Sequence, residues 1–142
     1  MAGPRRRFMV ADIAQQMVGG FLLAGPFVVT AEVWQLASEM SLLQGGLTAL
    51  IVFVIGYGAL YQADDRDPDR ERAIAGVPLR FLSLMVVSFG AVLILALVFN
   101  APATFLTDLG VPQEDWPYTT ATAVAIGSVF SVVGAATADS VF

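Results

Sequence analysis

The sequence has 142 residues, of which 57% are hydrophobic and 13% are charged, and its net charge is −5. Soluble domains are about a quarter charged, and a soluble protein this small has too little interior to bury so large an apolar fraction, so the composition favours a chain embedded in lipid. The absence of His and Cys excludes disulfides, thiolate nucleophiles and Cys/His metal centres, and the acidic balance argues against nucleic-acid binding.

The first predicted membrane span covers residues 8–36. Its core, residues 17–30, carries no charge. The apolar run is too long for a cleaved signal peptide and lacks a small-residue cleavage site after it, so we expect a retained helix. Pro26 lies inside this helix and should kink it, because proline frees the carbonyl of Leu22 from its hydrogen bond.

Three further apolar runs follow, and each is close to the roughly 20 residues that cross the hydrocarbon core as a helix. These predicted spans are residues 42–61, 79–99 and 119–138. The connections are a turn at 38–41, a hydrophilic loop at 62–78 and a loop with three prolines at 101–117. The sequence therefore predicts an all-α membrane protein, a small bundle of four transmembrane helices in a single domain.

The arginines predict the orientation. They precede the first span or lie in or beside the second loop, and the other two loops have none. Positively charged loops face the cytoplasm, so we expect both termini and loop 62–78 to be cytoplasmic, loop 101–117 to be extracytoplasmic, and the plasma membrane to be the location. Four aromatic residues near span ends fit interfacial belts: Trp34, Trp116, Tyr57 and Tyr61.

Glu32 is the first candidate functional residue. It lies about one turn inside the outer end of the first predicted helix. An ionisable group at membrane depth normally faces protein or water, and desolvation would raise its pKa, which suits a protonation role. In the alternative, Glu32 lies at the headgroup level and is solvated, since Trp34 marks the interface nearby.

Asp12 and Gln16 are candidates at the inner end of the same helix, where four-residue spacing puts them on one face. Twenty residues separate Asp12 from Glu32, about 30 Å along a helix, so the two acids lie near opposite membrane surfaces. They could mark the two mouths of a pathway. Alternatively, Asp12 and Gln16 are interfacial anchors that set the depth of the helix.

Charge and residue size also predict contacts between helices. Arg80 and Asp139 fall at cytoplasmic helix ends, and an ion pair between them, or between Arg80 and Asp12, would join helices. Small residues recur along the last span and would let helix backbones approach closely. The packing residues are Gly127, Ser131, Gly134 and Ala135.

Two motifs were considered as cation sites. Pro26 and Thr30, with neighbouring glycines, resemble a broken-helix element whose freed carbonyls can coordinate a cation, although prolines also bend membrane helices without further role. The acidic run at 64–69 has some of the spacing of an EF-hand, but it lacks the central Gly and the final Glu and contains Arg66. We therefore predict a solvated loop, with no metal and no cofactor.

The first helix resembles a family of prokaryotic integral membrane proteins catalogued as a domain of unknown function. The family pattern of Gly, Pro and Thr-x-Glu-x-Trp is matched by Gly20, Pro26, Thr30, Glu32 and Trp34. The lysine-free, Asp-rich composition and the ending at 131–142 are similar to short members with a halophilic composition. The resemblance covers nearly the whole chain and draws attention to Pro26 and Glu32, but it brings no activity, and longer members carry helices that this chain lacks.

Two functions remain open. A small ion or solute channel or transporter component, acting as a homo-oligomer within the bilayer, would explain Glu32, Pro26 and the small-residue face. An accessory or structural membrane subunit would explain why the second and third spans are almost uniformly apolar. An enzyme is not expected, because no paired Asp, Ser/His or His/Glu set lies at membrane depth.

Overall fold

The computed structural model describes residues 10–63 and 73–141, and these residues are mostly helical. Arg5 to Arg7 and the acidic loop 64–72 lie outside the described residues. The elements in chain order are α1 Val10–Val28, α2 Ala31–Glu39, α3 Leu42–Tyr57, the π-helical turn η1 Gly58–Ala63, the hairpin strands β1 Ala73–Ile74 and β2 Val77–Pro78, α4 Leu79–Val98, α5 Ala101–Asp108, the 3₁₀ turn η3 Gln113–Asp115 and α6 Trp116–Val141.

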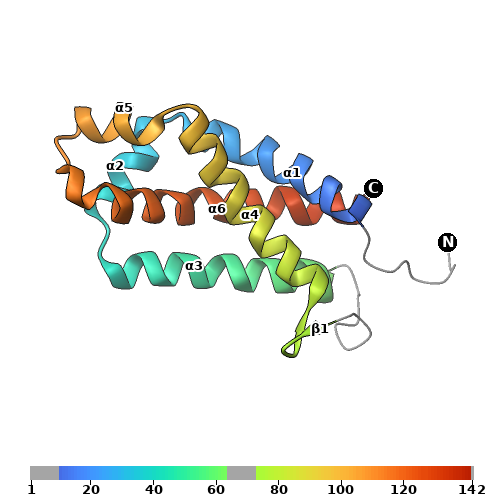
Figure 1. Cartoon of the computed structure of the whole chain (residues 1–142). Helices are drawn as coiled ribbons and strands as arrows, with labels where there is room; N and C mark the ends of the chain where they lie inside the picture. Colours follow the sequence, from blue (N-terminus) through green and yellow to red (C-terminus); the bar gives the residue numbers. More distant parts are fainter. Residues whose placement is uncertain (1–9, 64–72, 142) are drawn as a thin grey trace, which may run out of the picture.

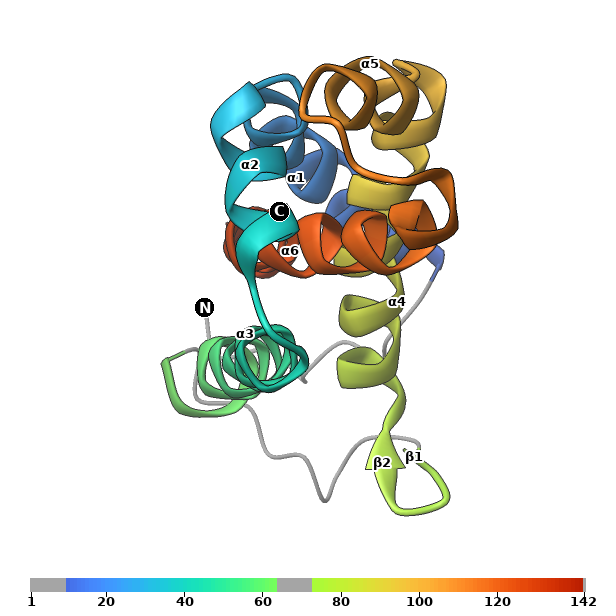
Figure 2. The same cartoon turned by 90° about the vertical axis from the view of Figure 1, so that its left-hand side faces the viewer.

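The predicted all-α membrane bundle is confirmed. Among the described residues, three helices are long and apolar enough to cross a membrane, and the bent pair α1–α2 makes a fourth span if it is counted as one. Helices α1, α3 and α6 run along the long axis, and α4 crosses the bundle obliquely (Figure 1). The start of α1 and the end of α6 lie at one end of the bundle, here called the terminal end, and α2 and α5 lie at the other, the cap end (Figures 1 and 2).

The prediction of a single helix over residues 8–36 is wrong. It is broken between Val28 and Ala31, and the axes of α1 and α2 differ by 80°. Pro26 lies within the last turn of α1, so the chain leaves the helix three residues after the proline. The 19 residues of α1 extend about 28 Å, which nearly spans the hydrocarbon core without α2.

The other boundaries agree with the sequence to within a few residues, with two differences. Helix α6 begins at Trp116 and continues to Val141, so it exceeds the predicted span at both ends. The predicted loop 101–117 contains α5, which starts after the left-handed residue Asn100 and has Pro102 in its first turn. Helix α3 begins at Leu42 directly after its N-cap residue Ser41, which forms a capping box with Gln44.

Glycines set the closest helix–helix contact. A Cβ atom on Gly19 of α1 would collide with the backbone carbonyl of Gly134 in α6, and a Cβ on Gly134 would collide with that of Gly19. The two helices therefore touch backbone to backbone, the type of contact that small residues allow in lipid. Nearly one turn before Gly134 in α6, the hydroxyl of Ser131 donates a 3.1 Å hydrogen bond to the carbonyl of Gly20.

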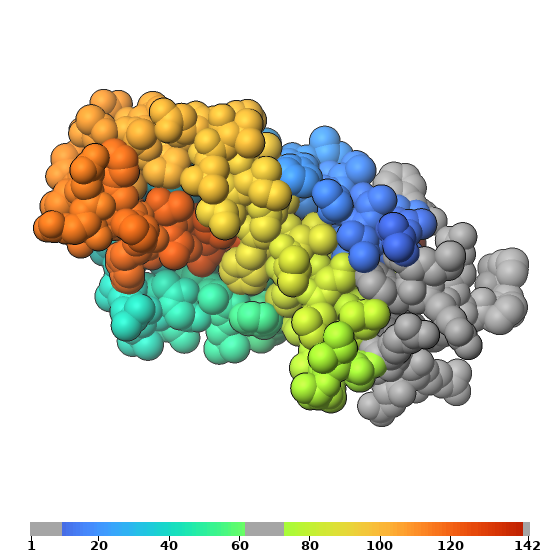
Figure 3. Space-filling view, viewed as in Figure 1, coloured from blue at the N-terminus to red at the C-terminus, as the bar shows by residue number. Residues whose placement is uncertain are grey.

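The buried apolar residues form two clusters along α6. The cap-end cluster joins α1, α2, α4, α5 and α6 around Trp34 and Leu106, and the second cluster joins η1, α3, α4 and α6 around Leu60 and Leu84. Helix α3 is peripheral, since only 11% of the apolar stretch that it begins is buried within the protein. Its remaining apolar surface suits contact with lipid. In the space-filling view, α4 lies across the front of α6, with α5 above it (Figure 3).

The α1–α6 contact yields a stability prediction. We expect Gly19→Ala to destabilise the protein by about 2 kcal/mol or more, because the added methyl group forces two backbones apart. The measurement is unfolding in detergent followed by circular dichroism. Gly90→Ala on α4 is the matched control, since nothing lies within 4 Å of a Cβ there, and it should be neutral or slightly stabilising. Equal stability of the two variants would contradict the contact.

Candidate functional site

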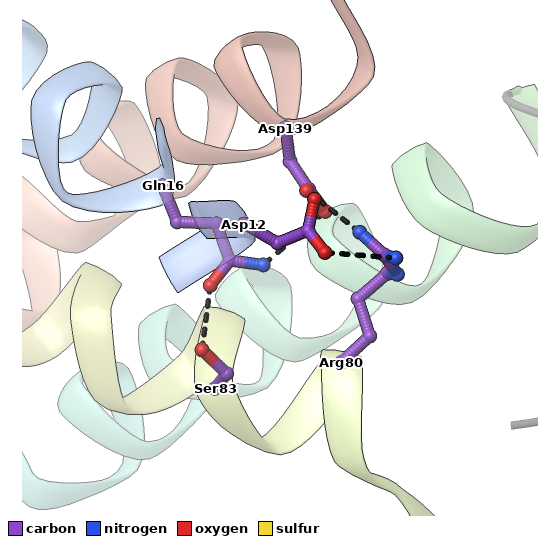
Figure 4. Close-up of polar contacts among 5 residues, drawn as sticks. All are labelled: Asp12, Gln16, Arg80, Ser83 and Asp139. Carbon is purple, nitrogen blue, oxygen red and sulfur yellow. Dashed lines mark hydrogen bonds and ion pairs between the residues drawn. The ribbon is translucent and has the colours of Figure 1, made fainter. Parts of the chain in front are cut away.

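Five polar side chains from three helices meet at the terminal end of the bundle (Figure 4). We call this group the polar cluster, and it consists of Asp12, Gln16, Arg80, Ser83 and Asp139. Arg80 donates from Nη1 to Asp139 Oδ1 at 2.7 Å and from Nη2 to Asp12 Oδ2 at 3.5 Å. Gln16 donates to Asp139 Oδ2 at 3.2 Å and accepts from the Ser83 hydroxyl at 2.7 Å.

Helix geometry brings the cluster together. Asp12 and Gln16 lie one turn apart on the buried face of α1, and Arg80 and Ser83 lie at the start of α4. Asp139 is near the end of α6, little more than one turn beyond Gly134. Because Gly134 contacts Gly19 of α1, this crossing places Asp139 beside the first turns of α1.

The cluster is buried within the protein. The side chain of Asp139 has no exposed surface, that of Arg80 is 3% exposed, and that of Asp12 is 11% exposed. The cost of desolvating such charges is offset only by close pairing and added hydrogen bonds, and Arg80, Gln16 and Ser83 provide both. The two ion pairs considered from the sequence, Arg80 with Asp139 and Arg80 with Asp12, therefore occur in the same cluster.

Buried hydroxyls extend from the cluster toward the middle of the bundle. Ser88, Ser128 and Ser131 have no exposed surface. Ser88 and Ser128 donate to carbonyls of their own helices, at 2.6 Å to Leu84 and 2.6 Å to Val124, whereas Ser131 bonds to Gly20 of α1. We call the polar cluster together with these three buried serines of α4 and α6 the polar seam.

The break between α1 and α2 is capped by side chains. The carbonyl of Phe27 accepts hydrogen bonds from the backbone nitrogen of Thr30 at 3.4 Å and from its hydroxyl at 3.0 Å. The carbonyl of Val28 accepts from the indole nitrogen of Trp34 at 2.9 Å. In an unbroken helix these carbonyls would accept from backbone nitrogens four residues later, so Thr30 and Trp34 supply the replacement donors.

The capping role changes the interpretation of Trp34. The prediction that it lies in an interfacial aromatic belt is wrong, because Trp34 is 1% exposed and its ring stacks on Phe105 of α5, with 6.1 Å between ring centroids. Trp116 is half-buried and donates to the Val111 carbonyl. Tyr57, the last residue of α3, is exposed, whereas Tyr61 in η1 is buried.

The other candidates from the sequence lie away from the polar seam or within helix contacts. Glu32 is exposed in the first turn of α2, beyond the break, and Pro26 is exposed at the end of α1. Gly127 contacts Val92 of α4, and Ala135 is buried in the second core cluster. Among the described residues, no group of three or more Asp or Glu side chains could hold a metal ion, and the acidic run at 64–69 lies outside them.

The polar cluster predicts a large effect of removing its cation. Arg80→Gln should lower the free energy of unfolding by roughly 3–5 kcal/mol, because Asp139 would keep its buried charge without an ion-pair partner. The double variant Arg80→Gln/Asp139→Asn should recover part of the loss. Unfolding in detergent measures both, with the exposed Asp108→Asn as control. A double variant less stable than Arg80→Gln would contradict the coupling.

The capped break predicts a second effect on stability. Trp34→Phe keeps an aromatic ring against Phe105 but leaves the Val28 carbonyl without its indole donor, so the cost should be roughly 1–3 kcal/mol. Glu32→Gln, two residues away on the exposed side of α2, should leave the melting temperature unchanged. Equal melting temperatures for wild type and Trp34→Phe in detergent would show that the indole hydrogen bond contributes nothing.

Comparison with known proteins gives one match. A family model described as "Putative integral membrane protein (DUF2391)" matches residues 4–140. No curated protein and no solved structure matches the chain. The match includes all of the described helices except the last residue of α6 and extends across nearly the full length, as the resemblance of the first helix implied. The chain therefore belongs to the DUF2391 family of integral membrane proteins.

Proposed function

We propose that this protein is a small ion or solute channel or transporter component. The observation that carries the proposal is the polar seam, in which charged and hydroxyl side chains extend from the terminal end into the interior of an otherwise apolar bundle. Polar and ionisable side chains inside membrane proteins are costly, and they commonly mark ion or solute pathways. The sequence predicts the ion pairs of the seam, but it does not predict that Ser88 and Ser128 are buried beyond them.

The cap end supports a closed pathway. Trp34 packs with Phe27, Val33 and Ala96 around a void that is too small for a water molecule. The void lies between α1, α2, α4 and α6. A solute could pass only if this end opened, and the break between α1 and α2 is the natural hinge, since Thr30 has an extended backbone between two helices. In the proposal, the seam is reached from the terminal end at Asp12, whose side chain is 11% exposed, and Trp34 closes the other end.

The proposal includes an orientation and an assembly. The terminal end faces the cytoplasm of the cell and the membrane is the plasma membrane, because Arg80 and the sequence positions of the other arginines are consistent with the positive-inside rule. At the cap end, the exposed acids Glu32, Glu39 and Asp108 have no basic residue near them in sequence. We further propose a homo-oligomer whose subunits each carry a seam, since four short helices give each subunit room for only a narrow pathway.

An accessory subunit without transport activity is the second candidate. It is favoured by the fact that Ser88 and Ser128 already donate to carbonyls of their own helices. Buried serines with this bonding are also found in helices that only pack. The two functions differ in what the hydroxyls do, so a variant that removes one hydroxyl without disturbing the fold distinguishes them.

The test is ion and proton flux into liposomes that contain purified protein. If the seam carries a solute, Ser128→Ala should reduce flux roughly fivefold, because a lost hydrogen bond costs about 1 kcal/mol. Ser140→Ala, an exposed serine on the same helix, is the matched control. Glu32→Gln tests the acid at the cap end, and mass in detergent tests the oligomer.

Each of three outcomes would contradict a different part of the proposal. No flux of cations, anions or protons from folded wild-type protein would favour the accessory subunit. Flux that is unchanged in Ser128→Ala would place any pathway outside the seam. A monomeric mass together with normal flux would reject only the oligomer.

A further inference from the structure

A groove lies between α4, α5 and the first half of α6, on the side of the molecule seen in Figure 3. Its volume is about 760 Å³, within the size range of small-molecule sites. We call it the α4–α6 groove. Its main lining residues are Phe89, Leu93, Leu97, Pro102, Trp116 and Val124. None of these residues belongs to the polar seam, so the groove is a separate feature.

The groove is open to the hydrocarbon phase along its length. Phe89, Leu93 and Leu97 recur every four residues on one face of α4, and Leu93 and Leu97 are 41% and 60% exposed. On the opposite wall, Trp116 and Val124 are eight residues apart, about 12 Å along α6. Both helices are candidate membrane spans, so an extended apolar chain can enter sideways from the bilayer.

The polar residues that line the groove are Gln113 of η3, at the cap end, and Thr120, one turn into α6. Glu114 and Asp115 follow Gln113 in the chain, and both are exposed. Asp108 adds a third exposed carboxylate at the end of α5, and residues 101–141 contain no basic residue. A phosphate headgroup would be repelled by these acids, whereas an uncharged headgroup can hydrogen-bond to the Gln113 amide.

We propose that the α4–α6 groove binds the hydrocarbon chain of a membrane lipid whose headgroup is uncharged. The apolar lining holds the chain between α4 and α6, and the headgroup lies at Gln113. The acidic residues select against anionic lipids, which bulk contact with the bilayer would not do. This inference does not depend on the transport function, because lipid binding is measured without flux.

Trp116 provides the readout. Of the two tryptophans, Trp116 lines the groove, whereas Trp34 of α2 is buried and does not line it. Purified protein in detergent is titrated with a monoacylglycerol brominated on its chain, and with a brominated phosphatidylglycerol of the same chain. We expect the uncharged lipid to quench fluorescence saturably, with an apparent affinity at least tenfold higher than that of the anionic lipid.

Two variants make the test specific. Ala121→Phe places a ring in the groove and should abolish saturable quenching. Leu50→Phe, on the exposed surface of α3 outside the groove, is the matched control and should quench as wild type does. Circular dichroism confirms that both variants are folded.

Three results would overturn the proposal. Quenching that rises in proportion to lipid without saturating, or that is equal for the two headgroups, would mean bulk contact only. Saturable quenching that survives Ala121→Phe would place the lipid elsewhere. A dimer that dissociates in Ala121→Phe, without lipid quenching, would identify a second copy of the chain as the occupant.

Discussion

The backbone contact between Gly19 and Gly134 is the constraint on which the rest of the structure depends. It brings α1 and α6 closer than any pair of larger residues would allow, and the hydroxyl of Ser131 can then reach the Gly20 carbonyl. The same approach places Asp139 next to the first turns of α1. The buried charges are therefore a consequence of how closely two helices pack, because Arg80 can bridge two carboxylates only if α1 and α6 are in contact.

Much of the fold could be predicted from the sequence, because lipid permits few solutions. The apolar runs gave the spanning helices α3, α4 and α6 to within a few residues, since membrane thickness sets their length. The break before Ala31 could not be predicted from Pro26 alone. It depends on Thr30 and Trp34 supplying donors to two freed carbonyls, and the indole of Trp34 reaches Val28 only once the chain has turned. Trp34 was misassigned for the same reason, since an interfacial tryptophan and a buried one look alike in sequence.

The candidate site could be predicted only in part. Arg80, Asp12 and Asp139 stood out because charges at helix ends are few in this chain and are expected to pair. Ser88 did not stand out as a buried residue, because a nearly uniformly apolar helix such as α4 carries no pattern that fixes its rotation. Only contact with neighbouring helices decides which face is buried. A regular spacing of Ser and Gly on α6 was the available signal, and it indicated packing without indicating the seam.

The pairing of the first spanning helix with the last constrains how the protein is made. Helix α1 alone is less apolar than α3 and α4, which are apolar enough to enter the bilayer independently. Helix α1 contacts α4 and, more extensively, α6, which is synthesised after the other described helices. Arg80 is therefore available to Asp12 before Asp139 is, and the polar cluster is completed only once α6 has entered the bilayer. A ribosome that stalls before residue 116 would leave α1 and α4 in the bilayer without α6.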